Sequence, residues 1–315
     1  MLLNVAIFVL SCLGIIVSSR WIIDSLARVT RSLGWKEFVV AFFTASIGAV
    51  LPEFFIGIRA AIGGVPELAF GNIVGQNLIL FTFSVAICTL VLGGIVVESR
   101  TVRSGTGFAL ISVILPFILI YDGVISRIDG LILIIAFLLY VRWLFKDDDR
   151  FAKEYDDKKE ISGDLFSIIR DISIVIGGFL IVVFAAEGIT GSAQAFAEAI
   201  DIPIGLVGLF FVGAGVALPE TFLSVRLAMK GHSWMILGGL MGAIAMSSTL
   251  VLGVVALIEP IEIYNFDPYH IGRLFLILSG AVLWFFVRTS NRITTREAII
   301  LLLVYGSFLV CQFIL

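Results

Sequence analysis

The chain has 315 residues, of which 60% are hydrophobic and 14% charged, with a mean hydropathy of +1.12 and a formal net charge of −3. Soluble domains contain roughly 45–50% apolar and about 25% charged residues, so these values exclude a soluble domain, a disordered chain and a nucleic-acid-binding protein. The three cysteines stand singly in apolar segments, which excludes a disulfide framework and a zinc ribbon. The composition therefore predicts a polytopic membrane protein.

Ten segments are long and apolar enough to cross a bilayer, which requires about 20 residues per helix. The predicted fold class is accordingly an all-α membrane protein with ten transmembrane helices. The predicted spans are about 3–22, 37–62, 67–92, 105–121, 125–145, 167–190, 203–229, 234–258, 271–288 and 296–314.

Basic residues indicate how these helices are oriented. If both termini are outside, 18 of the 21 lysine and arginine residues fall in cytoplasmic connections, as the positive-inside rule requires. We therefore expect both termini outside, in a bilayer that is most simply the plasma membrane. The polar segment Lys146–Glu160 lacks the glycine-centred spacing of a calcium-binding loop and is interpreted as part of a cytoplasmic linker over residues 146–166.

The chain contains an internal repeat. Shifted by 167 residues without gaps, SIGAVLPEFFIGIRAAIGG superimposes on GAGVALPETFLSVRLAMKG, and glycine, proline and glutamate positions coincide. The second copy begins five helices after the first, and because five is odd the two copies enter the membrane from opposite faces. Inverted repeats of this kind are typical of secondary transporters. The predicted division is a first half at 1–145 with its repeat motif at 37–92, the linker at 146–166, and a second half at 167–315 with its repeat motif at 203–258.

Glu53 and Glu220 are the matched carboxylates of the repeat, and each follows a proline in the middle of a predicted helix. A charge at this depth costs at least ~2.5–3.5 kcal/mol, and such residues usually line an ion pathway. Proline removes a backbone donor, so we expect an opened turn with free carbonyl oxygens beside each carboxylate. An oxygen-only site of this type suits Ca²⁺ and, less selectively, Mn²⁺ or Mg²⁺. Without a cation, at least one of two facing glutamates must take a proton, so one ion leaves only as another arrives.

The opposing wall is predicted to come from GNIVGQN and its counterpart GGLMGAI. Their glycines provide either close helix packing or a direct site role. Asn72, Gln76 and Asn77 need polar partners in a membrane, and for each we leave open ion coordination or a hydrogen bond between helices. The second copy lacks these amides and offers hydroxyls about a turn deeper, of which Ser247 is the candidate ligand.

The chain resembles the cation/calcium exchanger superfamily, of the sodium/calcium exchanger type. The family elements G-T-S-x-P-E and G-N-x-x-G-S-N correspond to GAVLPE with GNIVGQN, and to GVALPE with GGLMGAI. The resemblance implies that Glu53 and Glu220 bind Ca²⁺, and that the first and sixth helices move to switch access. It implies a transporter of inorganic cations, not an enzyme, with no cofactor.

The departures from the family pattern concern the counter-ion. The family Thr-Ser pairs, which the resemblance assigns to sodium, are Ala49-Val50 and Val216-Ala217 here. We therefore expect an antiporter that exchanges Ca²⁺ or a similar divalent cation for Na⁺ or H⁺. The alternatives are a cation/proton exchanger that does not use Na⁺, and a transport-inactive member that serves as a membrane scaffold or sensor.

Arg59 and Arg226 lie six residues beyond the two glutamates, which is about 9 Å along a helix. Two roles are open for them. Their side chains reach the headgroups, or they place a fixed positive charge in each vestibule, which would oppose cation entry.

Overall fold

The computed structural model describes residues 2–32, 37–97, 100–146, 165–229, 233–263, 267–289 and 292–314, so most of the predicted linker lies outside the described residues. The first half contains α1 (Leu2–Ser32), α2 (Glu37–Ile62), α3 (Pro66–Ile79), η1 (Leu80–Ser84), α4 (Val85–Leu92), α5 (Arg100–Leu119), η2 (Ile120–Asp122) and α6 (Arg127–Lys146). The second half contains α7 (Leu165–Ile200), α8 (Ile204–Val207), η4 (Gly208–Val212), α9 (Gly213–Met229), α10 (Ser233–Met246), η5 (Ser247–Val251), α11 (Leu252–Ile258), α12 (Asp267–Thr289) and α13 (Thr295–Ile314).

These elements form the ten predicted spans, and the all-α membrane fold is confirmed. Within the described ranges, eight helices are long and apolar enough to cross a membrane. The other two predicted spans are α2 and α6, single helices of 26 and 20 residues. Both α1 and α7 run about ten residues beyond their predicted ends. For α7 the stop is local: Asp201 has a φ of 53°, and Pro203 follows.

The 167-residue register extends over both halves of the structure. It carries α3 onto α10, η1 onto η5 and the start of α5 onto the start of α12, without any gap. Four short strands obey the same register approximately: β1 (Ile95–Val96) pairs with β4 (Arg292–Ile293), and β2 (Val124–Ile125) pairs with β3 (Ile261–Glu262). Adding 167 to β1 gives a range that overlaps β3, so each ladder is the repeat counterpart of the other.

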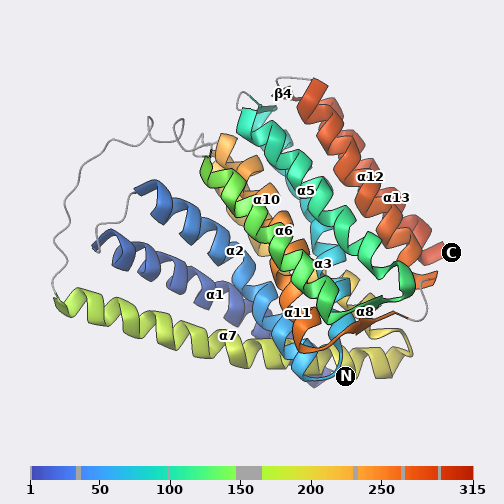
Figure 1. Cartoon of the computed structure of the whole chain (residues 1–315), viewed down its shortest axis with the longest axis horizontal. Helices are drawn as coiled ribbons and strands as arrows, with labels where there is room; N and C mark the ends of the chain where they lie inside the picture. Colours follow the sequence, from blue (N-terminus) through green and yellow to red (C-terminus); the bar gives the residue numbers. More distant parts are fainter. Residues whose placement is uncertain are drawn as a thin grey trace.

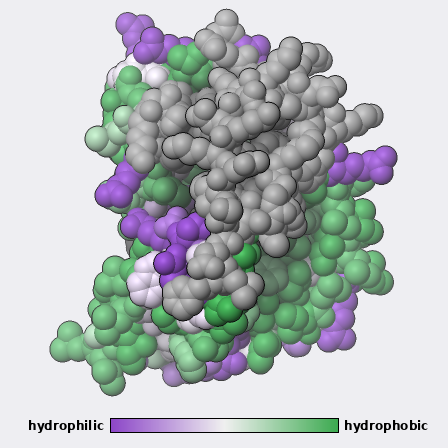
Figure 2. Space-filling model, turned by 90° about the vertical axis from the view of Figure 1, so that its left-hand side faces the viewer, coloured by the Kyte–Doolittle hydropathy of each residue, from purple (hydrophilic) through white to green (hydrophobic). Residues whose placement is uncertain are grey.

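The two ends of the bundle differ in what they contain. Figure 1 shows α1 beginning and α13 ending at one end, which we call the terminal end, whereas α6 ends and α7 begins at the opposite end, which we call the linker end. The spans α3–α4 and α10–α11 are the most buried of the eight candidates. Figure 2 shows hydrophobic residues over much of the described surface on one side, as expected of a lipid-facing exterior.

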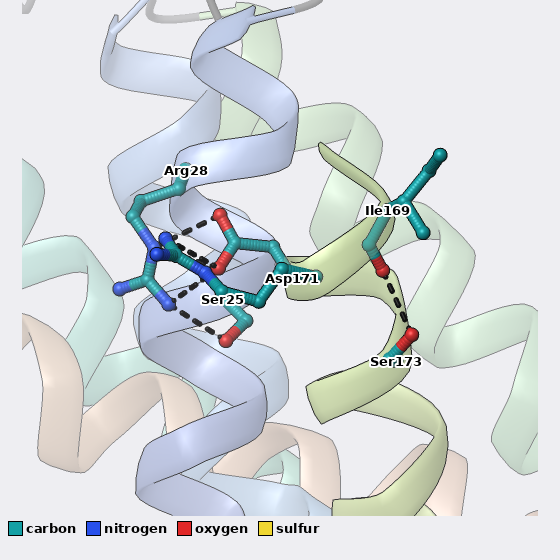
Figure 3. Close-up of polar contacts among 6 residues, drawn as sticks. Ser25, Arg28, Ile169, Asp171 and Ser173 are labelled. Atoms are coloured by element: carbon teal, nitrogen blue, oxygen red, sulfur yellow. Dashed lines mark hydrogen bonds and ion pairs between the residues drawn. The ribbon is translucent and has the colours of Figure 1, made fainter. Parts of the chain in front are cut away.

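The long helices α1 and α7 lie antiparallel along one side of the molecule (Figure 1). Their packing is close: a Cβ added to Gly188 would lie 2.2 Å from the Ser11 side-chain oxygen. Near the linker end, Arg28 donates to both oxygens of Asp171 at 2.8–3.1 Å and to the Ser25 hydroxyl at 2.8 Å (Figure 3). Asp171 is buried while Arg28 is about half exposed. The two helices are therefore joined by small residues along their length and by an ion pair at one end.

We expect Arg28→Ala to destabilise the protein more than Asp171→Asn. The first change leaves a buried carboxylate with only the weaker contact to Arg170 at 3.5 Å, whereas the second leaves an arginine that water can reach. Thermal unfolding in detergent should show a loss of about 1–3 kcal/mol for Arg28→Ala and less for Asp171→Asn. Equal losses would mean that the buried carboxylate does not control the effect.

Candidate functional site

Glu53 and Glu220 come together at one side-chain amide. Glu53, on α2, is fully buried, and Glu220, on α9, is half-buried. The Nε2 atom of Gln76, on α3, donates a hydrogen bond to Glu53 Oε1 and lies 3.4 Å from Glu220 Oε2. One nitrogen therefore reaches both carboxylates, which belong to different repeats. Neither side chain is turned toward lipid.

The backbone beside the two glutamates differs from the expectation. Pro52 and Pro219 lie inside α2 and α9, and both helices continue through them without a break. Helix geometry widens elsewhere, into π turns at η1 and η5 on the opposing wall and at η4, seven residues before Pro219. The expectation of an opened turn at each proline was therefore wrong. Each proline still removes one backbone donor from its helix, but neither helix ends there.

Asn77 is occupied by a contact between helices. Its Nδ2 donates to the Ser248 hydroxyl at 2.8 Å, and its Oδ1 accepts from the Ser247 hydroxyl at 3.0 Å. Ser247 lies 3.2 Å from the Ile244 carbonyl as well. For Asn77, of the two roles left open, the structure shows the hydrogen bond between helices. The pair of serines ties α3 to η5 at the residue that follows Gln76.

Several buried polar atoms at the site have no partner among the described residues. They are Glu53 Oε2, Gln76 Oε1 and both polar atoms of the Asn72 amide, whose side chain is 1% exposed. Asn72 and Gln76 are four residues apart on α3 and share one face of the helix. Buried polar groups are nearly always hydrogen-bonded, so three such oxygens in one place indicate room for a ligand.

One polar contact beside the site was not predicted. The Ser84 hydroxyl, in η1, lies 2.5 Å from the Thr221 hydroxyl, and Thr221 directly follows Glu220. The only signal in the sequence is the position of Thr221 after the Pro-Glu pair, where the first repeat has Phe54. This contact holds the α9 segment that carries Glu220 against η1.

The two repeats pack differently around the carboxylates. A Cβ on Gly71 or Gly75 would lie 1.9 Å from a backbone carbonyl oxygen of the second repeat, that of Gly205 or Leu209. Their counterparts on α10 pack less closely. Among the described residues, no atom lies within 4 Å of a Cβ on Gly238, which is exposed, as is its neighbour Gly239, and the nearest atom to a Cβ on the buried Gly242 is the Tyr140 hydroxyl at 3.7 Å. Gly71 and Gly75 therefore act in packing. Among the described residues, packing is therefore close beside α3 toward the terminal end, and glycines are exposed on α10 toward the linker end.

The two arginines six residues beyond the glutamates have different partners. Arg59 forms an ion pair with Glu187 on α7, and Arg226 stacks over the Phe222 ring at 4.9 Å. Among the described residues, no group of three or more His, Cys, Asp and Glu side chains is placed to hold a metal ion. The two glutamates, with amide neighbours, are thus the charged part of the site.

Comparison with known proteins identifies the family and the fold. A family profile described as "Sodium/calcium exchanger protein" matches residues 3–146 and 171–314. The sodium/calcium exchanger MaX1 of Methanosarcina acetivorans is 22% identical, with 98% of each chain covered, and the putative antiporter CaxA of Alkalimonas amylolytica is 23% identical, with 96% of this chain and 97% of CaxA covered.

Solved structures share the fold. The sodium–calcium exchanger NCX_Mj superimposes with a TM-score of 0.67 at 24% identity, covering 98% of both chains. The H⁺/Ca²⁺ exchanger CAX gives a TM-score of 0.76 at 16% identity, covering 97% of this chain and 82% of the other. The profile covers both halves and nearly all of the described residues, so the chain belongs to the sodium/calcium exchanger protein family of membrane transporters.

Proposed function

We propose that this protein is a secondary antiporter that exchanges Ca²⁺, or a similar divalent cation, for Na⁺ or H⁺ by alternating access. The observation that carries the proposal is the meeting of Glu53 and Glu220 at one buried amide between the two inverted repeats. Two carboxylates in a membrane interior need positive charge, and a transported cation supplies it. We place both termini outside and the linker in the cytoplasm.

The remaining ligands would be neutral oxygens on α3. Gln76 Oε1 and Asn72 Oδ1 are buried without partners, on the same helix face as the amide nitrogen that contacts the carboxylates. With the cation absent, the Gln76 N–H group supplies partial positive charge to the two glutamates. Rotation of this amide by half a turn would replace the donor with Oε1, an oxygen ligand of the kind that Ca²⁺ prefers. Gln76 would thus respond to occupancy of the site.

The residues around the pair favour a proton as the counter-ion. Val50, Val216 and Ala217 are buried and offer no side-chain oxygen. The nearby hydroxyls of Ser247 and Ser248 bind Asn77, and those of Thr82 and Thr249 donate to carbonyls of their own helices. Among the described side chains, few ligands are therefore left for sodium, whereas a carboxylate takes a proton without further ligands. The second candidate is therefore a cation/proton exchanger that does not use Na⁺.

Radioactive Ca²⁺ uptake into proteoliposomes separates these functions. Uptake driven by an outward Na⁺ gradient alone indicates sodium coupling, and uptake driven by an outward H⁺ gradient alone indicates proton coupling. We expect the proton gradient to drive the larger flux. Folded protein without flux under either gradient would contradict transport and favour a scaffold.

We expect Glu53→Gln and Glu220→Gln each to abolish exchange, with a fall of at least about 100-fold in initial uptake rate, since removal of either charge leaves one carboxylate for a divalent ion. Glu198→Gln, at an exposed glutamate near the end of α7, serves as the matched control and should retain the wild-type rate. A wild-type exchange rate in either site variant would contradict the assignment of the binding site to these two glutamates.

Gln76→Met keeps the length of the side chain and removes both polar atoms. We expect the Ca²⁺ concentration for half-maximal uptake to rise about tenfold, which corresponds to the loss of one ligand interaction worth about 1.4 kcal/mol. Gln194→Met on α7 should leave it unchanged. An unaltered Ca²⁺ dependence in Gln76→Met would show that this amide does not face the ion.

A further inference from the structure

The ion pair of Arg59 and Glu187 joins two helices that belong to different repeats. Arg59 is on α2, six residues beyond Glu53, and Glu187 is on α7. The side chains of Arg59 and Glu187 are 36% and 58% exposed, so the ion pair lies at the surface of the helix contact. The pair therefore fastens the end of α2 that is nearer the terminal end to the long peripheral helix α7.

The repeat register gives this pair a counterpart of the opposite character. Shifting by 167 residues places Arg226 at the position of Arg59, and it places Arg20 at the position of Glu187. The attractive pair of Arg59 and Glu187 thus corresponds, in the repeat register, to two positive charges, Arg226 and Arg20. In the structure these two arginines are exposed, and Arg226 lies over Phe222.

The contacts of the two repeats show which arrangement is present. Among the described residues, α2 packs along α7, whereas α9 contacts α1 over a short stretch, in which Gly215 lies near Cys12. Gly71 and Gly75 pack against backbone toward the terminal end, whereas Gly238 and Gly239 are exposed toward the linker end, with no described atom within 4 Å of a Cβ at either, and we take this side as the open one. In a protein of inverted repeats, the opposite access state exchanges the conformations of the two repeats. That exchange would bring Arg226 toward Arg20 and draw Arg59 away from Glu187.

We propose that Arg59 and Glu187 form a latch that favours the state open at the linker end, and that Arg20 and Arg226 disfavour the opposite state by like-charge repulsion. This inference rests on the proposed function, since it presupposes two access states. As a consequence, the two access states are unequally populated. Without transported ions, most molecules have the site open at the linker end. Under the proposed topology that end faces the cytoplasm.

Cysteine labelling measures the rare state directly. Cys12, Cys88 and Cys311 are first replaced by alanine, and Leu68→Cys or Asn72→Cys is introduced as the reporter. Both reporter positions are buried on α3, 0% and 1% exposed, and Asn72 is the repeat counterpart of the exposed Gly239. The rate at which a membrane-impermeant maleimide labels them from the terminal side then follows the population of the opposite state. Leu68→Cys lies outside the proposed ligand set, so it serves if Asn72→Cys fails to fold.

We expect Glu187→Gln to raise the labelling rate of either reporter about two- to fivefold, the range for a partly exposed ion pair. Arg20→Glu should raise it similarly, because it makes the counterpart pair attractive. Arg59→Glu combined with Glu187→Arg restores an attractive pair and should return the rate to the starting value. Glu198→Gln, an exposed glutamate on the same helix, is the control without effect.

An unchanged rate in Glu187→Gln, or a rate that stays raised after the charge exchange, would overturn the latch. Both results come from labelling rates alone. The proposed function is tested separately, by Ca²⁺ flux through the protein without these charge substitutions. Labelling of Gly239→Cys from the linker side should be fast both with and without the Glu187→Gln substitution. Absence of that labelling in folded protein would contradict the open side assigned here.

Discussion

Glu53 and Glu220 place two acidic groups within reach of one amide in the interior of a membrane protein, and the charge of this pair must be balanced locally. Gln76 provides only the partial charge of an N–H group, and Glu53 Oε2 has no partner among the described residues. Other parts of the architecture position this pair. Two repeats supply one carboxylate each, and the contact of Ser84 with Thr221 secures the segment that carries the second.

The fold was largely predictable because it depends on local and periodic properties of the sequence. Apolar length fixed the ten helices, and the register of Pro-Glu and glycine positions fixed the two repeats, which the structure extends to helices and π turns at the same spacing of 167. The ends of α1 and α7 were predicted too short. Their outer turns are more polar. In α1 these turns contain Arg28, whose contact with Asp171 is not detected by a window of apolar residues.

The details of the site depend on side chains that meet across helices, and sequence reasoning identified the residues without their partners. Asn77 is a candidate ligand by composition, yet two serines 170 and 171 residues away take up both ends of its amide. Gln76 is one of three amides in a short segment, and only packing of α3 between α2 and α9 places its nitrogen at both glutamates. Pro52 and Pro219 signalled irregular helices, but tertiary contacts keep those turns regular.

Two copies of one sequence pattern adopt different packing in a single molecule, and this difference bears on mechanism. Gly71 touches the backbone of the other repeat, whereas its counterpart Gly238 is exposed and has no described atom within 4 Å of a Cβ built there. The repeat unit is thus compatible with both a closed and an open arrangement, as exchange of access requires. A perfectly symmetric pair of repeats would give both access states equal energy. Here the repeats differ at Gln76 against Ala243 and at Glu187 against Arg20. In our proposals the first difference acts on ion binding, and the second acts on the balance between the two access states.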